Sequence, residues 1–136
     1  MIAKKLLYTL SFCLISLFTF AQDSPAGLWK TIDDKTGEAK SHVEIYEEDG
    51  IYYAKIVKLL QSPSDVVCDA CPGDKKGKPV MGMVIMWDLK KHKDYWSYGR
   101  IMDPENGKTY KCNVYLEKDG TPVSYTHLTL PTICSV

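Results

Sequence analysis

The chain has few of the residues that conventional catalysis and metal binding need. Its 136 residues include three histidines, and neither His42 nor His92 stands at a recognisable spacing from a nucleophile or an acid partner. One C-x-x-C pair supplies two of the four ligands of a structural zinc site, and no second pair follows. The sequence therefore predicts no catalytic residue, no metal site and no cofactor.

A strongly basic surface is also missing. Lysine and arginine together number 17, aspartate and glutamate together number 17, and the formal net charge is zero. Proteins that bind nucleic acid or an anionic membrane surface present a basic face to it. The composition therefore gives no indication of a nucleic-acid partner, and it says nothing of oligomeric state.

A long hydrophobic run occurs only at the start of the chain. Leu6 to Phe20 carries no charge, follows Lys4 and Lys5, and precedes the small residue Ala21, which is the order of a secretory signal peptide. The run is shorter than the ~20 residues that span a bilayer. We predict that residues 1–21 are a signal peptide cleaved after Ala21. Because no cysteine stands at the cleavage point, the expected product has no lipid anchor and no integral membrane segment.

The rest of the chain lacks repeats, low-complexity linkers and helical periodicity, and consists of short β-prone runs separated by turn residues. Asp49-Gly50 between two such runs is a strong hairpin signal, and turns are also predicted at residues 90–94 and 103–107. The runs alternate between apolar and polar side chains, as half-buried strands do. Six strands are predicted, at Gly27–Ile32, Ser41–Glu48, Ile51–Leu60, Gly82–Leu89, Tyr95–Ile101 and Lys108–Glu117. Their spacing indicates a mostly β fold, an antiparallel meander curled toward a barrel.

Longer motifs carry a family resemblance. Gly27-Leu28-Trp29 resembles the Gly-x-Trp signature on the first strand of lipocalin-like barrels. In this order after a signal peptide, "GLWKTIDDKTGEAKSHVEIYEEDGIYYAKIVKL", "CDACPGDKKGKPVMGMVIMWDL" and "RIMDPENGKTYKCNVYLEKDG" resemble the bacterial secreted family Domain of Unknown Function 2147. The resemblance runs from Pro25 to about Gly120. It implies an exported lipocalin-like barrel over residues 22–122, periplasmic or extracellular, and carries over no established functional residues.

The C-terminal segment departs from this pattern. Val123 to Val136 contains no Asp, Glu, Lys or Arg, whereas family members should continue with further strands rich in Gly, Arg and Trp. Propensity alone would make part of it a strand. The codons of its first ten residues, VSYTHLTLPT, however, can be written so that they resemble the mosaic end plus adapter of transposase-based sequencing libraries, with a sample index in the residues that follow. We therefore interpret residues 123–136 as a non-native tail, give no weight to His127 or Cys134, and expect a barrel that is incomplete because its closing strands are missing.

Cysteine spacing points to one cross-link. Cys68 and Cys71 are expected to form a disulfide in an oxidising compartment, where it would hold the long loop between Gln61 and Pro79. The alternative is a thiol redox site, which nearby lysines would favour. Redox pairs usually stand at a helix N-terminus, and the prolines and glycines of residues 72–79 argue against a helix there. Cys112 falls on the apolar face of its strand and is expected to behave as a small hydrophobe.

The aromatic content suggests a ligand. Small barrels can hold one molecule in their mouth, although aromatic side chains can equally well fill the core. The candidate lining residues are Trp29, Tyr53, Trp87, Trp96, Tyr98 and Tyr110. The leading hypothesis is non-catalytic binding of a small apolar or amphipathic molecule in the cell envelope. A redox or other enzyme using Cys68 and Cys71, and a protein-interaction module, are the alternatives.

The interpretation of the tail gives a first prediction. When the gene is sequenced in its source genome past the codon for Pro122, we expect the reading frame to continue into about two further strands, because an open barrel leaves an unpaired edge. A genome that itself encodes VSYTHLTLPTICSV would overturn this expectation and restore residues 123–136 to the native protein.

Overall fold

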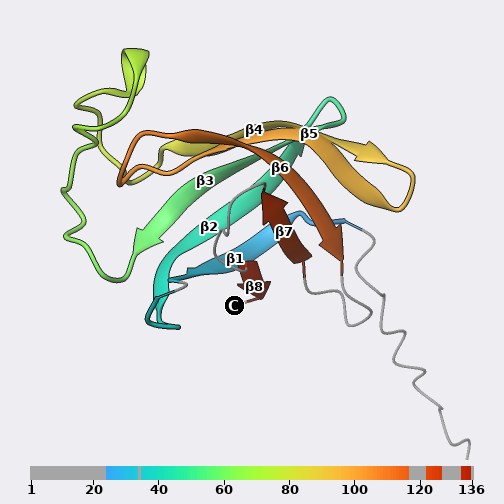
Figure 1. Cartoon of the computed structure of the whole chain (residues 1–136), viewed down its shortest axis with the longest axis horizontal. Helices are drawn as coiled ribbons and strands as arrows, with labels where there is room; N and C mark the ends of the chain where they lie inside the picture. The colour runs from blue at the N-terminus through green and yellow to red at the C-terminus, as the bar shows by residue number, and fades with distance from the viewer. Residues whose placement is uncertain (1–23, 34, 117–121, 127–132, 136) are drawn as a thin grey trace, which may run out of the picture.

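The protein is an antiparallel β-sheet that curls into a half-barrel (Figure 1). The computed structural model describes residues 24–33, 35–116, 122–126 and 133–135. Eight strands lie in the order β7-β6-β5-β4-β3-β2-β1-β8, so successive strands are neighbours except at β8, which pairs with β1. The strands are β1 (Gly27–Ile32), β2 (Ala39–Glu48), β3 (Ile51–Leu59), β4 (Val84–His92), β5 (Tyr95–Met102), β6 (Thr109–Leu116), β7 (Pro122–Thr126) and β8 (Ile133–Ser135). The predicted mostly β, antiparallel meander is confirmed.

The hairpin turns follow their sequence signals, with one exception. Asp49 and Gly50 join β2 to β3 with φ values of 52° and 79°, the left-handed conformation that Asp tolerates and Gly favours. The turn predicted over residues 90–94 is wrong in extent. Residues 90–92 continue β4, and the turn is confined to Lys93 and Asp94 between the paired residues His92 and Tyr95. Lysine-rich composition hides this part of the strand, because its side chains are mostly exposed.

Two β-bulges, which lie opposite each other in the paired strands β4 and β5, curve the sheet. Met86 and Leu89 are three residues apart yet both are fully buried, and Asp88 between them has φ 59°. In β5, Tyr98 has φ 64° where the pairing with β6 changes register. Bulges of this kind bend a strand and return the next side chain to the core face. Leu89 then packs over Gly99, where an added Cβ would lie 2.8 Å from Leu89 Cδ1.

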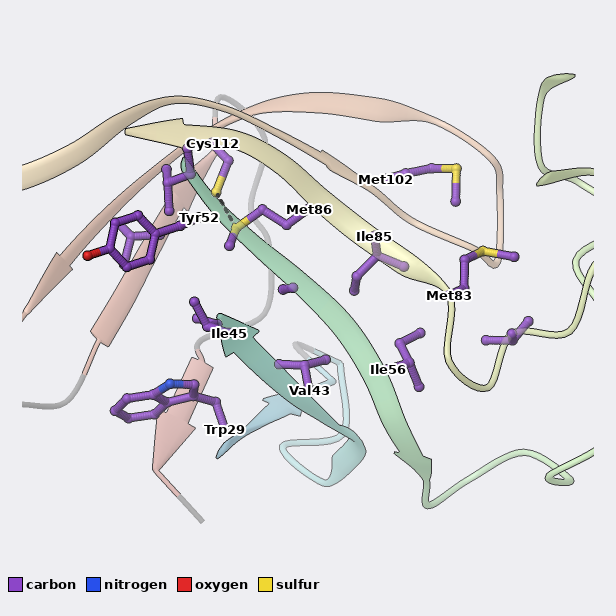
Figure 2. Packing of buried hydrophobic residues seen from close by; sticks show 14 of the residues in the cluster. Trp29, Val43, Ile45, Tyr52, Ile56, Met83, Ile85, Met86, Met102 and Cys112 are labelled. Atoms are coloured by element: carbon purple, nitrogen blue, oxygen red, sulfur yellow. Dashed lines mark hydrogen bonds between the residues drawn. The ribbon is translucent and has the colours of Figure 1, made fainter. Parts of the chain in front are cut away.

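The concave face of the sheet forms the core (Figure 2). The predicted alternation is correct, because the inward members of β2, β3 and β6 are buried, namely Val43, Ile45, Ala54, Ile56, Cys112 and Val114. One end of the interior, which we call the aromatic end, is filled by large rings. There Trp29 donates its indole N–H to the Pro25 carbonyl at 2.7 Å, and Tyr52 meets Trp96 edge to face at 6.0 Å.

The long connection from β3 to β4 covers the opposite end of the interior. Residues 61–80, which we call the disulfide loop, contain one turn of 3-10 helix, η1 (Gly73–Lys75), and an isolated bridge between Val67 and Pro79. The prolines and glycines thus permit a three-residue 3-10 turn, where the sequence predicted no helix at all. Within the described residues, no helix is long and apolar enough to cross a lipid bilayer.

The two C-terminal strands lie within or beside the segment predicted to be non-native. β7 pairs with β6 through Pro122 to Thr126, and β8 pairs with β1, with Cys134 opposite Lys30. His127 lies outside the described residues. The interpretation of residues 123–136 as adapter-derived concerns the origin of the segment, and it stays a prediction.

The packing of Leu89 on Gly99 is testable. We expect Gly99→Ala to lower the free energy of unfolding by about 1–3 kcal/mol, since the new methyl group would crowd the buried Leu89 side chain and lie 3.0 Å from the Cys112 carbonyl oxygen. Urea denaturation would measure the loss. In a Leu89→Val background, which removes the colliding methyl group, the same substitution should cost less. Equal costs in both backgrounds would contradict the proposed contact.

Candidate functional site

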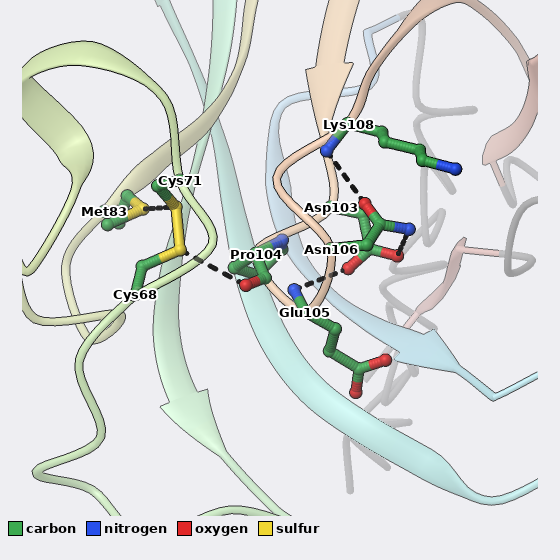
Figure 3. Close-up of a disulfide and its surroundings, with 8 residues drawn as sticks. All are labelled: Cys68, Cys71, Met83, Asp103, Pro104, Glu105, Asn106 and Lys108. Carbon is green, nitrogen blue, oxygen red and sulfur yellow. Dashed lines mark hydrogen bonds between the residues drawn. A yellow bond between two sulfur atoms is a disulfide. The ribbon is translucent and has the colours of Figure 1, made fainter.

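The disulfide predicted between Cys68 and Cys71 is present and buried. Their Cα atoms are 5.4 Å apart, and the residues are 1% and 2% exposed. Figure 3 shows Cys68 Sγ directed at the Pro104 carbonyl oxygen, 3.2 Å away, and Cys71 Sγ beside Met83 Sδ at 3.9 Å. Because disulfide sulfurs carry no hydrogen, these are packing contacts. The disulfide therefore faces the turn between β5 and β6 rather than solvent.

Main-chain hydrogen bonds shape the disulfide loop into a narrow hairpin. The Cys68 N–H donates to the Lys78 carbonyl at 2.8 Å, and the Gly77 N–H donates to the Cys68 carbonyl at 2.7 Å. Further along, the Val80 N–H donates to the Val66 carbonyl at 3.0 Å. With these bonds and the disulfide, the loop is a structured wall over one end of the half-barrel.

The turn between β5 and β6, residues 103–108, supports this wall. The Asp103 side-chain oxygen Oδ1 accepts a hydrogen bond from the Glu105 N–H at 2.9 Å, and the Asp103 main-chain carbonyl accepts one from the Gly107 N–H at 2.7 Å. Gly107 has φ 71°, and a Cβ there would overlap the Ala70 carbonyl oxygen. Only glycine satisfies both the left-handed conformation and this close approach.

A cavity of about 430 Å³ lies where the disulfide loop and this turn meet the ends of the strands. Its lining is Thr31, Lys40, Ser41, Ile56, Leu59, Gln61, Ser62, Val66, Val67, Asp69, Ala70, Val80, Ile85, Ile101, Met102, Asp103, Pro104 and Glu105. The buried members, apart from Ser41, are apolar, whereas most polar members are partly or fully exposed. The site is thus an apolar floor with a polar mouth.

Two polar contacts interrupt the apolar lining. Thr31 Oγ1 and Ser41 Oγ are 2.8 Å apart on neighbouring strands, and Ser41 is only 6% exposed. Nearer to solvent, Lys40 Nζ lies 2.9 Å from Glu105 Oε1 and joins β2 to the turn between β5 and β6. The first contact belongs to the interior and the second to the mouth.

The three predicted tryptophans lie away from this cavity. Trp29 and Trp96 are each 2% exposed and pack at the aromatic end. The Trp96 indole N–H has no hydrogen-bond partner within the described part of the chain. Trp87 is half-buried, and Lys75 Nζ lies 5.2 Å from its ring centroid. None of the three belongs to the cavity lining.

The three predicted tyrosines do not line the cavity either. Tyr53 stacks on Tyr46 with ring centroids 5.6 Å apart. Burial raises the pKa of the Tyr46 phenol most, and the negative charge of Glu48 raises it further. Tyr98 is 65% exposed on its bulge, and Tyr110 is half-buried on β6. Of the six predicted aromatic residues, the structure therefore buries Trp29 and Trp96, leaves Tyr53, Trp87 and Tyr110 half-buried, and exposes Tyr98, which the bulge in β5 separates from the buried Trp96.

Sequence patterns did not indicate the residues that do line the cavity. Asp103 and Glu105 belong to a stretch that reads as an ordinary turn, and Val66, Val80 and Asp69 belong to a loop without periodicity. The disulfide spacing was the single local signal that this loop is structured. Within the described ranges, no three His, Cys, Asp or Glu side chains are grouped so that they could hold a metal ion.

Comparison with known proteins agrees with this geometry. Residues 27–129 match the family described as uncharacterized protein conserved in bacteria, DUF2147. The chain belongs to this family. Its structure is similar to that of protein HP1028 from the human pathogen Helicobacter pylori, which belongs to the lipocalin family, with a TM-score of 0.72 and 20% sequence identity over 83% of each chain. At that identity the likeness shows the fold, a lipocalin-like one. No curated protein matches the sequence.

In this DUF2147 protein, comparing substitutions at two glycines distinguishes the cost of a left-handed backbone conformation from the cost of contact with the disulfide loop. Gly37 and Gly107 have φ values of 72° and 71°, and each N–H donates at 2.7 Å to the carbonyl of an aspartate four residues earlier. Only Gly107 touches the disulfide loop, since a Cβ at Gly37 would meet nothing within 4 Å. Gly37→Ala is therefore the matched control.

We expect Gly37→Ala to lower the free energy of unfolding by about 1 kcal/mol, the cost of a left-handed alanine. Gly107→Ala should cost about 2–4 kcal/mol, because the turn must also move off the Ala70 carbonyl. Urea denaturation monitored by tryptophan fluorescence measures both. Equal losses would show that the turn accommodates the added methyl group without a clash against the disulfide loop.

Proposed function

We propose that the protein binds a small apolar or amphipathic molecule in the cavity beneath the disulfide loop, without catalysing a reaction on it. The observation that carries the proposal is the cavity itself. Its volume of about 430 Å³ lies in the range of small-molecule sites, ~300–1,000 Å³. Such sites combine a mostly apolar lining with a few placed polar groups, and this cavity has both.

The energetics favour an apolar body in the floor of the cavity. Each methylene group transferred from water to an apolar surface gains about 0.8 kcal/mol. The floor side chains, among them Ile56, Val80, Ile85 and Met102, are already held by the core. Because the disulfide and its hydrogen bonds order the loop beforehand, little conformational entropy is lost when a ligand binds.

Export to the cell envelope is part of the proposal. Its support is the N-terminal run of residues 1–21, with the order of a secretory signal, and the disulfide, which persists in oxidising compartments. A periplasmic or extracellular bacterial protein that holds an apolar molecule would keep it out of the surrounding water.

The buried disulfide favours binding over thiol redox chemistry. Thiol–disulfide exchange requires that a thiolate reach one of the two sulfurs, and its rate depends on access. Cys68 and Cys71 are almost wholly buried, against Pro104 and Met83 respectively. This arrangement supports a structural cross-link rather than a redox pair.

A blocking substitution at the mouth tests the proposal. Val67 lines the cavity and is 41% exposed, whereas Leu60 is 40% exposed and does not belong to the lining. With the hydrocarbon fluorophore diphenylhexatriene as probe, we expect Val67→Trp to weaken binding about tenfold or more, a loss of about 1.4 kcal/mol. Leu60→Trp, the matched control, should bind as the unaltered protein does.

The measurement is a fluorescence titration of each variant. Failure of the unaltered protein to bind the fluorophore would overturn the proposed function. Equal affinities of the two tryptophan variants would place any binding elsewhere on the protein.

A further inference from the structure

Two hydroxyl groups lie on the concave face of the sheet, where the neighbouring inward positions are apolar. Thr31 pairs with Ser41 across β1 and β2, two residues along from the pair of Trp29 with Val43. Because side chains alternate along a strand, both hydroxyl residues share the inward face with that buried pair. They also line the cavity. A polar pair at this place is not needed to fill the core.

The hydroxyl pair has one hydrogen more than its own contact uses. Each hydroxyl carries one hydrogen and can accept through two lone pairs. A single hydrogen bond of 2.8 Å joins the two oxygens, and no other hydrogen bond of either hydroxyl occurs within the part of the chain that the structure describes. One O–H therefore remains available to an acceptor in the cavity.

The charges of the lining decide which acceptor is favoured. Asp69, Asp103 and Glu105 contribute three carboxylates, and the one lysine, Lys40, is already paired with Glu105 at 2.9 Å. The Asp103 carboxylate is held in its own turn, where it accepts hydrogen bonds from the Glu105 N–H and from the Asn106 side-chain amide. An anionic ligand would meet an excess of negative charge with its only counter-ion occupied.

We propose that the Thr31–Ser41 pair recognises the oxygen of an uncharged, oxygen-bearing apolar molecule, such as a long-chain ketone, ester or alcohol. The inference rests on the proposed function and names the class of its ligand. The alkyl part lies on the apolar floor, and the ligand oxygen accepts the spare O–H. A pure hydrocarbon gains nothing from this hydrogen bond, and a fatty-acid anion is repelled by the carboxylates.

Competition against bound diphenylhexatriene tests the inference, with 2-undecanone and decanoate as competitors. The double variant Thr31→Val/Ser41→Ala removes both hydroxyls with little change of shape, and a double change is needed because either hydroxyl alone could donate. We expect it to bind 2-undecanone about three- to tenfold more weakly, the loss of one neutral hydrogen bond. Its affinity for diphenylhexatriene, which has no oxygen, should change less than about twofold.

The control is Thr109→Val, the same chemical change at an exposed residue outside the lining. It should leave both affinities unchanged. For the unaltered protein, decanoate should compete more weakly than 2-undecanone, and added salt should narrow the difference because salt screens the carboxylates.

The outcomes separate the two proposals. If the unaltered protein does not bind diphenylhexatriene, the proposed function fails. If it does, but the double variant binds 2-undecanone as tightly as before, the hydroxyl pair is not a recognition site and only this inference fails. If decanoate is the tighter competitor, the assignment to uncharged ligands is wrong.

Discussion

The contact between the disulfide loop and the turn of residues 103–108 creates the cavity. Gly107 approaches the Ala70 carbonyl so closely that no side chain can stand there, and Cys68 Sγ rests on the Pro104 carbonyl oxygen. A loop of this length would otherwise be free to sample many conformations, at a cost of roughly 1–2 kcal/mol per ordered residue. The disulfide, the hairpin hydrogen bonds and this contact together offset that entropic cost. The cavity is the space left between the ordered loop and the sheet.

Curvature of the sheet gives the interior two unlike ends. Bulges at Asp88 and Tyr98 bend β4 and β5, so that Leu89 and Trp96 both face inward. The rings of Trp29, Tyr52 and Trp96, each no more than 7% exposed, then fill the aromatic end. The opposite end has smaller aliphatic side chains and is closed by a loop rather than by rings. The proposed ligand site is therefore at the end of the interior that the rings do not fill.

Burying a polar group in an apolar cavity costs free energy unless the group forms a hydrogen bond. The Thr31 and Ser41 hydroxyls lie on an inward face where valine and alanine would satisfy the alternation of the strands. Their mutual hydrogen bond offsets part of the desolvation cost and uses one of the two hydroxyl hydrogens. At the mouth, the Lys40–Glu105 pair is partly exposed and adds little stability, but it neutralises the only cation of the lining. Together these groups are the basis of the proposed preference for an uncharged, oxygen-bearing ligand.

The amino-acid sequence by itself determined β1 to β6 apart from the end of β4, the inward faces of β2, β3 and β6, the Asp49-Gly50 hairpin and the link between Cys68 and Cys71, because each of these depends on residues close together in the chain. It could not determine which side chains meet around the cavity. Thr31, Asp69 and Glu105 come from β1, the disulfide loop and the turn after β5, and only the curl of the sheet brings them together. The six aromatic residues illustrate the same limit, since their number was evident but their division between core and surface followed from bulges and strand pairing. Local chemistry fixed the elements, and long-range packing decided where the cavity lies.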